Sequence, residues 1–183
     1  MRALGSPAIH ANDAVGAYWR GTPGVISEHL TGRRPARSET EVYYQELKDA
    51  EVDPHSGVAD VFAALQTRGR AVAVFTGNSS RAAGALLRSA SLRADVLIGY
   101  DLVSRPKPAP DGLLPTAEQL GVDPVDMACL GDSPLDLRTA AATGSHGAAA
   151  AWGHMYDRTE KADAVLSAPL QALGLLPMER MTM

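Results

Sequence analysis

The chain has 183 residues, of which 45% are hydrophobic and 21% are charged, a composition typical of a globular domain with a sizeable core. Its net charge of −4 gives no basis for a general affinity for nucleic acid or anionic membranes. The single cysteine, Cys129, excludes an internal disulfide, and no apolar run reaches membrane-spanning length. We therefore expect a cytoplasmic protein that binds neither nucleic acid nor membrane.

From residue 56 onward, helical and strand patterns alternate along the chain. Val58, Val61, Phe62 and Leu65 recur at the spacing of one helix face, whereas the strand patterns are short continuous apolar runs of the kind buried in parallel sheets. We expect helices at about 58–68, 80–89, 113–120 and 135–143, and strands at 71–75, 95–99, 127–131, 147–152 and 164–166. This alternation predicts an α/β fold with a doubly wound, parallel, Rossmann-like sheet.

The chain divides into three parts on these patterns. Residues 1–55 show no convincing strand and contain helical patterns at 25–30 and 39–48, so they form a helical appendage. Residues 56–176 form the α/β core, and residues 177–183 form a short tail. In parallel sheets ligands bind beyond the carboxyl ends of the strands, so the residues that follow each strand are the candidates for function.

Two carboxylates follow the strand at 127–131. Asp132 ends the strand and Asp136 lies in the first turn of the next helix, so both can share a hard cation such as Mg²⁺. The alternative is structural: Ser133 caps the helix, Pro134 takes the first helical position and Asp136 completes a capping box. That alternative explains Asp136 but not Asp132.

A phosphate cradle is predicted after the strand at 71–75. Thr76 supplies a hydroxyl, Gly77 permits close backbone approach, and Asn78 leads into a helix whose first N–H groups are free for an anion. Lys107 follows the strand at 95–99 and stands between two prolines, where a fixed ammonium can neutralise a phosphoryl group. An ordinary turn and a solvated loop lysine are the alternatives for these two segments.

In this order, these segments resemble the haloacid dehalogenase-like hydrolase superfamily, in particular its phosphoglycolate phosphatase and β-phosphoglucomutase-like subgroup. The resemblance implies a Mg²⁺-dependent phosphatase of a small phosphorylated metabolite that acts through an aspartyl-phosphate. It makes Thr76 the phosphate-binding hydroxyl, Lys107 the catalytic lysine, and Asp132 and Asp136 the magnesium acids. The helical appendage would be a partial cap.

The family's nucleophile motif, Asp-x-Asp-Gly after an N-terminal apolar strand, has no counterpart before the core. Asp13 is followed at suitable spacing by Gly16, but Val15 replaces the second aspartate, so a loop or helix-cap role is favoured for Asp13. We expect instead that Met1 falls within the cap and that the central first strand is missing or replaced. Residues 6–13, a partner chain or residues outside the sequence would then fill its position, and strand exchange between chains is conceivable. The oligomeric state stays open.

Three function classes follow. The first is a phosphatase chain that is truncated, with weak or no activity of its own. The second is a catalytically dead relative that binds a phosphorylated ligand or a partner protein. The third, a phospho-receiver domain, is disfavoured because Lys107 precedes Asp132. In the cap, a solvated basic turn is favoured for Arg33, Arg34 and Arg37 over substrate contact, and His154 is a minor candidate near the rim.

Overall fold

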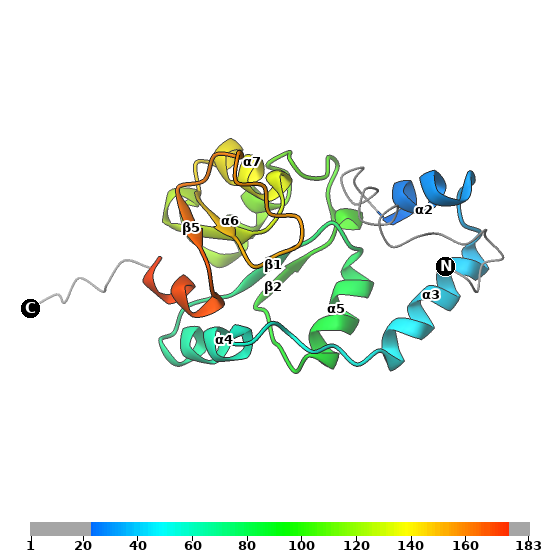
Figure 1. Cartoon of the computed structure of the whole chain (residues 1–183), viewed down its shortest axis with the longest axis horizontal. Helices are drawn as coiled ribbons and strands as arrows, with labels where there is room; N and C mark the ends of the chain where they lie inside the picture. The colour runs from blue at the N-terminus through cyan, green and yellow to red at the C-terminus, as the bar shows by residue number, and fades with distance from the viewer. Residues whose placement is uncertain (1–22, 176–183) are drawn as a thin grey trace, which may run out of the picture.

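The computed structural model describes residues 23–175, and Asp13 and the segment 6–13 lie outside this range. The strands of the described part pair in parallel within each of two sheets (Figure 1). They form a two-stranded sheet, β1-β2, and a three-stranded sheet, β3-β4-β5. The strands are β1 (Ala73–Phe75), β2 (Val96–Ile98), β3 (Ala128–Gly131), β4 (His146–Ala150) and β5 (Ala164–Leu166).

Helices connect the strands as the alternating pattern predicts. Ser79 caps α5, and glycines in the left-handed conformation, Gly121 and Gly144, end α6 and α7. The α-helices are α2 (Pro23–Thr31), α3 (Arg37–Asp49), α4 (Val58–Thr67), α5 (Ser80–Ser89), α6 (Leu113–Leu120) and α7 (Pro134–Thr143). Short 3₁₀ helices are η2 (Tyr100–Leu102), η3 (Pro124–Asp126) and η4 (Pro169–Gly174). None of the helices in the described ranges is long and apolar enough to cross a membrane.

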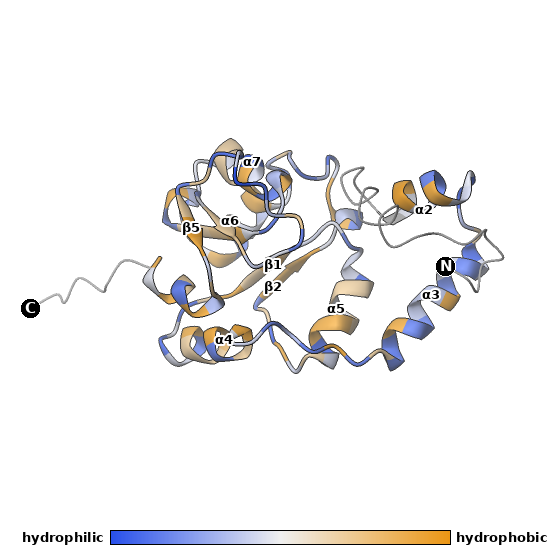
Figure 2. Cartoon of the chain, viewed as in Figure 1, coloured by the Kyte–Doolittle hydropathy of each residue, from blue (hydrophilic) through white to orange (hydrophobic). Residues whose placement is uncertain are grey.

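The core lies between the strands and the helices that cover them. Small side chains allow α7 to approach β4 closely: Ala140 and Ala148 are fully buried, and a side chain at Gly147 would press against Ala140. Helix α6 contacts both β2 and α7, so it joins the two sheets, and η4 packs on α4. Figure 2 shows apolar residues on β1, β2 and α4, whereas α3 is largely hydrophilic.

Strands β1 and β3 differ from the expectation that they are buried on both faces. Leu130 in β3 is 39% exposed, and no residue of β1 is fully buried. The reason is topological, because β1 pairs only with β2, and β3 only with β4, among the strands of the described part. Each of these strands therefore keeps one edge without a strand partner, and the side chains near it have less cover.

Backbone hydrogen bonds show which residues direct their N–H and C=O groups toward the edges of β1 and β3 that have no strand partner. Along a strand, successive residues direct their N–H and C=O groups to opposite edges. Thr76 N donates to Ile98 O, so Thr76 faces β2 and Phe75 faces the other edge of β1. His146 N donates to Met127 O, so Leu130, an odd number of residues away, faces the edge of β3 remote from β4.

Candidate active site

Lys107 links the ends of β1 and β3. Its ammonium donates to the carbonyl oxygen of Phe75 at 2.7 Å and to Asp136 Oδ1 at 2.6 Å. It also lies 4.7 Å from the centre of the Phe75 ring. The side chains of Lys107 and Asp136 are only 17% and 14% exposed, so this pair is weakly screened by solvent. The end of a strand, a loop and the first turn of a helix thus meet at one rim.

The loop that carries Lys107 is closed by an ion pair. Arg105 binds Asp111 through its guanidinium, with Nη2 2.7 Å from Oδ1, and through its backbone N–H at 3.1 Å. The Arg105 guanidinium lowers the pKa of Asp111, and the peptide bond between Lys107 and Pro108 is cis. The clasp between Arg105 and Asp111, which sequence patterns did not reveal, holds both ends of the segment around Lys107.

Asp136 fills the structural role that the sequence offers as an alternative. Its Oδ2 accepts from Ser133 N at 3.0 Å and from Ser133 Oγ at 2.9 Å, which completes a capping box for α7. Its other oxygen is held by Lys107. A side chain at Gly131 would collide with Asp136, so this glycine permits the close approach. The capping contacts fix the orientation of the carboxylate toward Lys107.

Asp132 is the more accessible of the two acids. Its side chain is 29% exposed, and its Oδ2 accepts from Met155 N at 3.2 Å. His154 Nδ1 lies 3.7 Å from the same oxygen, which places His154 beside the rim. A side chain at Gly153 would overlap Asp132. Asp132 is therefore open to a further ligand, whereas Asp136 already accepts from Lys107 and Ser133.

The carboxylate oxygens of Asp132 and Asp136 are ligands of the type that a hard cation prefers. No cluster of three or more His, Cys, Asp or Glu residues in the described ranges is arranged to hold a metal ion. Mg²⁺ does not need such a cage, because it is commonly held by one or two carboxylates while water and substrate phosphate complete its octahedral shell. The rim thus suits Mg²⁺ better than a metal that requires three or four protein ligands.

The loop after β1, Thr76–Ser79, forms a tight turn at the end of the strand. Thr76 Oγ1 accepts from Asn78 N at 3.1 Å, which folds the turn tightly. Within the described ranges the N–H groups of Gly77 and Ser79 have no protein acceptor, so they are available to an oxyanion. Ser79 is 5% exposed and caps α5 by accepting from Ala82 N at 3.2 Å.

Asp101 occupies part of the helix end that the sequence assigns to phosphate. Its carboxylate accepts from Ser80 N at 2.6 Å and from Ser80 Oγ at 2.6 Å. Burial opposes the ionised form, yet these hydrogen bonds lower the pKa of Asp101 overall. An incoming phosphate is therefore left with the N–H groups of Gly77 and Ser79 rather than that of Ser80.

Other candidates are structural. Arg33 forms a two-point ion pair with Glu39 and Arg34 binds Glu28, so both arginines have partners within the helical appendage. Burial raises the pKa of Cys129 to about 11, which keeps this thiol protonated and unreactive at neutral pH.

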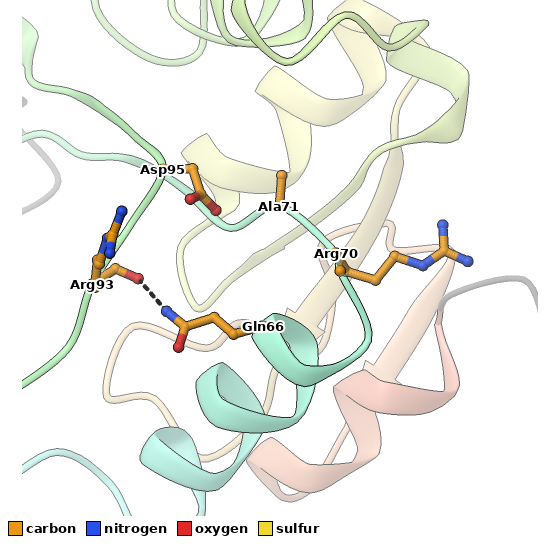
Figure 3. A pocket seen from close by; sticks show the side chains of 6 residues that line it. Gln66, Arg70, Ala71, Arg93 and Asp95 are labelled. Atoms are coloured by element: carbon orange, nitrogen blue, oxygen red, sulfur yellow. Dashed lines mark hydrogen bonds between the residues drawn. The ribbon is translucent and has the colours of Figure 1, made fainter.

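A separate pocket of about 460 Å³ lies at the opposite ends of β1 and β2 (Figure 3). Its polar groups are used within the fold: Gln66 Nε2 donates to Arg93 O at 3.5 Å, and Asp95 accepts from Val72 N at 2.8 Å. Figure 3 shows Arg70 and Arg93 directed away from each other, so the two cations do not converge on one anion. The pocket is no alternative to the rim.

A lysine held by two acceptors, a tight turn and two carboxylates thus lie at one rim of a parallel α/β fold. The chain belongs to the haloacid dehalogenase-like hydrolase family, whose model matches residues 5–144.

Curated relatives of the chain are phosphatases. It is 33% identical over 116 residues to phosphoglycolate phosphatase of Escherichia coli, which covers 62% of this chain and 46% of that protein. It is 28% identical over 148 residues to N-acetylmuramic acid 6-phosphate phosphatase of Pseudomonas aeruginosa, covering 78% of this chain and 66% of that protein. The chain therefore spans about half the length of the phosphoglycolate phosphatases it matches.

Solved structures share the fold. CbbY of Rhodobacter sphaeroides, crystallised in complex with phosphate, superposes with a TM-score of 0.76 at 24% identity and covers 91% of this chain and 82% of that chain. A predicted phosphoglycolate phosphatase of Haemophilus somnus superposes with a TM-score of 0.76 at 17% identity, covering 95% and 85% of the two chains. These likenesses confirm the α/β fold class that the sequence predicts.

Proposed function

We propose that the complete protein is a Mg²⁺-dependent phosphatase of a small phosphorylated metabolite, and that residues 23–175 supply its phosphate- and metal-binding half. The observation that carries this proposal is Lys107, whose ammonium is held between Phe75 O and Asp136 at the rim. The names of the curated relatives, phosphoglycolate phosphatase and N-acetylmuramic acid 6-phosphate phosphatase, support the substrate class.

Each rim residue has a defined task in this proposal. The Thr76 hydroxyl and the N–H groups of Gly77 and Ser79 bind phosphoryl oxygens, with Asn78 shaping the turn. Lys107 neutralises negative charge on the phosphoryl group, which otherwise repels an anionic nucleophile. Asp132 would hold Mg²⁺ directly, and Asp136 through water, because its oxygens already accept from Lys107 and Ser133. Bound Mg²⁺ supplies further charge neutralisation of the phosphoryl oxygens.

The nucleophile is assigned to a strand that pairs with the unpaired edges of β1 and β3. The edge of β1 that carries Phe75 O lies toward Asp136, since Lys107 contacts both. A parallel strand between β1 and β3 would satisfy both edges and deliver an aspartate beside Lys107. Asp13, at the end of residues 6–13, is the weaker candidate for this aspartate, and a strand from outside the 183 residues is the stronger one.

The second candidate function is phosphate-ligand or partner-protein binding without turnover. The observation that favours it is that no aspartate at the described rim is assigned to attack phosphorus, since Asp132 and Asp136 are the proposed magnesium acids. The rim then binds a phosphorylated molecule without the group that would form an aspartyl-phosphate.

A phosphate-release assay with the complete gene product tests the proposal. Phosphoglycolate, N-acetylmuramic acid 6-phosphate and a set of sugar monophosphates serve as substrates, with Mg²⁺ present or removed by chelation. We expect Mg²⁺-dependent release from at least one ester and its loss in Thr76→Val, which keeps the side-chain shape but removes the hydroxyl. Absence of release from every ester, together with retained phosphate binding, would favour the binding protein.

A further inference from the structure

Helix α3 packs against α5, its neighbour in Figure 1, and two of its side chains contact the start of α5 beside the turn Thr76–Ser79. Tyr44 shares a hydrogen bond with Ser79, with 2.8 Å between the two hydroxyl oxygens. Arg81 forms a two-point ion pair with Glu41, in which Nη1 lies 2.8 Å from Oε2. The same guanidinium stacks 4.1 Å above the centre of the Tyr44 ring. Tyr44 and Glu41 therefore bind the first turn of α5 together.

Ser79 makes this contact relevant to the proposed phosphate site. The residue caps α5, is almost completely buried, and follows Asn78 directly in the turn. Its N–H is one of the groups that we assign to the phosphate, and its hydroxyl shares a hydrogen bond with the Tyr44 hydroxyl. Any displacement of α3 at Tyr44 thus acts on a residue that shapes the phosphate site.

The far end of α3 is held separately. Ser89, at the end of α5, donates from its hydroxyl to Ala50 O at 2.6 Å and accepts from Val52 N at 3.2 Å. Between these two ends α3 buries no residue, and Figure 2 shows it largely hydrophilic. A helix that is held by a few polar contacts can detach at low cost in free energy. The part of α3 around Tyr44 can therefore respond to phosphate binding at the turn.

We propose that Tyr44 and Arg81 are positioning residues that couple the docking of α3 to phosphate binding at Thr76–Ser79. This inference rests on the proposed function of the rim. The docked Tyr44 hydroxyl fixes Ser79 and so orders the two N–H groups that receive the anion. By thermodynamic linkage, phosphate bound at the turn stabilises the docking of α3 by the same factor.

Calorimetric titration of the 183-residue chain with inorganic phosphate in the presence of Mg²⁺ tests the coupling. We expect Tyr44→Phe to weaken phosphate binding about threefold or more, because it removes one hydrogen bond and keeps the ring. Arg81→Gln should weaken it similarly. The matched control is Arg33→Gln, which removes an Arg–Glu pair confined to the appendage, and it should leave phosphate affinity unchanged.

Amide hydrogen exchange of residues 37–49 provides a second measurement. If the contact between Tyr44 and Ser79 only stabilises the fold, phosphate should not change the exchange rate of α3. In the unaltered chain, phosphate should slow exchange in α3, and in Tyr44→Phe this response should be lost. If the unaltered chain binds phosphate while Tyr44→Phe keeps both its affinity and the exchange response, the coupling is refuted and the proposed function stands. If the unaltered chain binds no phosphate, the proposed function itself fails.

Discussion

Lys107 and Asp136 form an ion pair of 2.6 Å although 29 residues separate them in the sequence. Both side chains are largely shielded from solvent, and the carboxylate is oriented by the cap of α7. One acid therefore both caps α7 and holds Lys107. The capping and functional interpretations of Asp136 are compatible, because its two oxygens face different partners.

The clasp that closes the Lys107 loop is predicted to matter for phosphate. Asp111→Asn removes the charge that holds Arg105, so Lys107 becomes less fixed and phosphate binding should weaken severalfold. Calorimetry with inorganic phosphate measures the effect. Glu160→Gln is the matched control, since Glu160 is 18% exposed in its pair with Arg138 and Asp111 is 17% exposed in its pair with Arg105. Equal phosphate affinity in both variants would contradict a role for the clasp.

Magnesium affinity is predicted to depend on Asp132. Asp132→Asn should weaken Mg²⁺ binding about tenfold or more, because it removes a carboxylate from a site that has few protein ligands. Ser133→Ala removes the capping hydroxyl and should destabilise the protein by about 1 kcal/mol, but it should weaken Mg²⁺ binding much less than Asp132→Asn, because Asp136 keeps its contacts with Ser133 N and Lys107. Titration calorimetry and thermal unfolding measure the two quantities. Unchanged Mg²⁺ affinity in Asp132→Asn would mean that the acids only serve the turn.

The acid titration of Glu39 tests whether Arg33 is held in its ion pair with Glu39. The hydrogen bond from Arg33 and that from Ala36 N lower the pKa of Glu39 to about 2. The contribution of Glu39 to stability is thus complete above the ordinary glutamate pKa of about 4.3 and is lost as the pH falls through about 2. Carboxyl NMR should show this midpoint, and Arg33→Gln should raise it. An ordinary midpoint in the unaltered chain would leave Arg33 available to a substrate.

Hydrolysis by the 183-residue chain is predicted to be negligible. With Mg²⁺ and para-nitrophenyl phosphate, release of the phenolate should stay near the uncatalysed rate, and Asp13→Asn should change nothing. Robust turnover that Asp13→Asn abolishes would contradict this prediction and identify Asp13 as the nucleophile.

Sequence patterns predicted most of the local structure because capping residues and glycines mark the ends of its helices. The helices expected at 80–89, 113–120 and 135–143 are present at nearly those bounds, with Ser79, Gly121 and Gly144 at their ends, and the apolar runs at 96–98 and 164–166 are strands. The burial of β1 and β3 was predicted wrongly. An apolar run indicates what a strand can bury, whereas its actual cover depends on which strands lie beside it, and that is a property of the whole sheet.

Within the site, patterns identified residues that follow strands but missed those that act through long-range contacts. Thr76, Lys107, Asp132 and Asp136 each follow a strand in the sequence, and Lys107 joins its loop to the end of β1 and to Asp136 through two hydrogen bonds. Tyr44, Asp101 and Asp111 carry no local signal, since their partners depend on how helices and loops pack. The capping box was visible in the spacing of Ser133 and Asp136, but the ion pair with Lys107 was not.

Calorimetric titration of inorganic phosphate into the unaltered chain and into Lys107→Met, with and without Mg²⁺, tests the central claim most directly. The methionine keeps the length of the side chain but removes the ammonium between Phe75 O and Asp136. We predict measurable phosphate binding that Mg²⁺ strengthens, and at least a tenfold loss in Lys107→Met, as expected for one charge-assisted hydrogen bond. Equal phosphate affinity in the two proteins would contradict the assignment of this rim as the phosphate site.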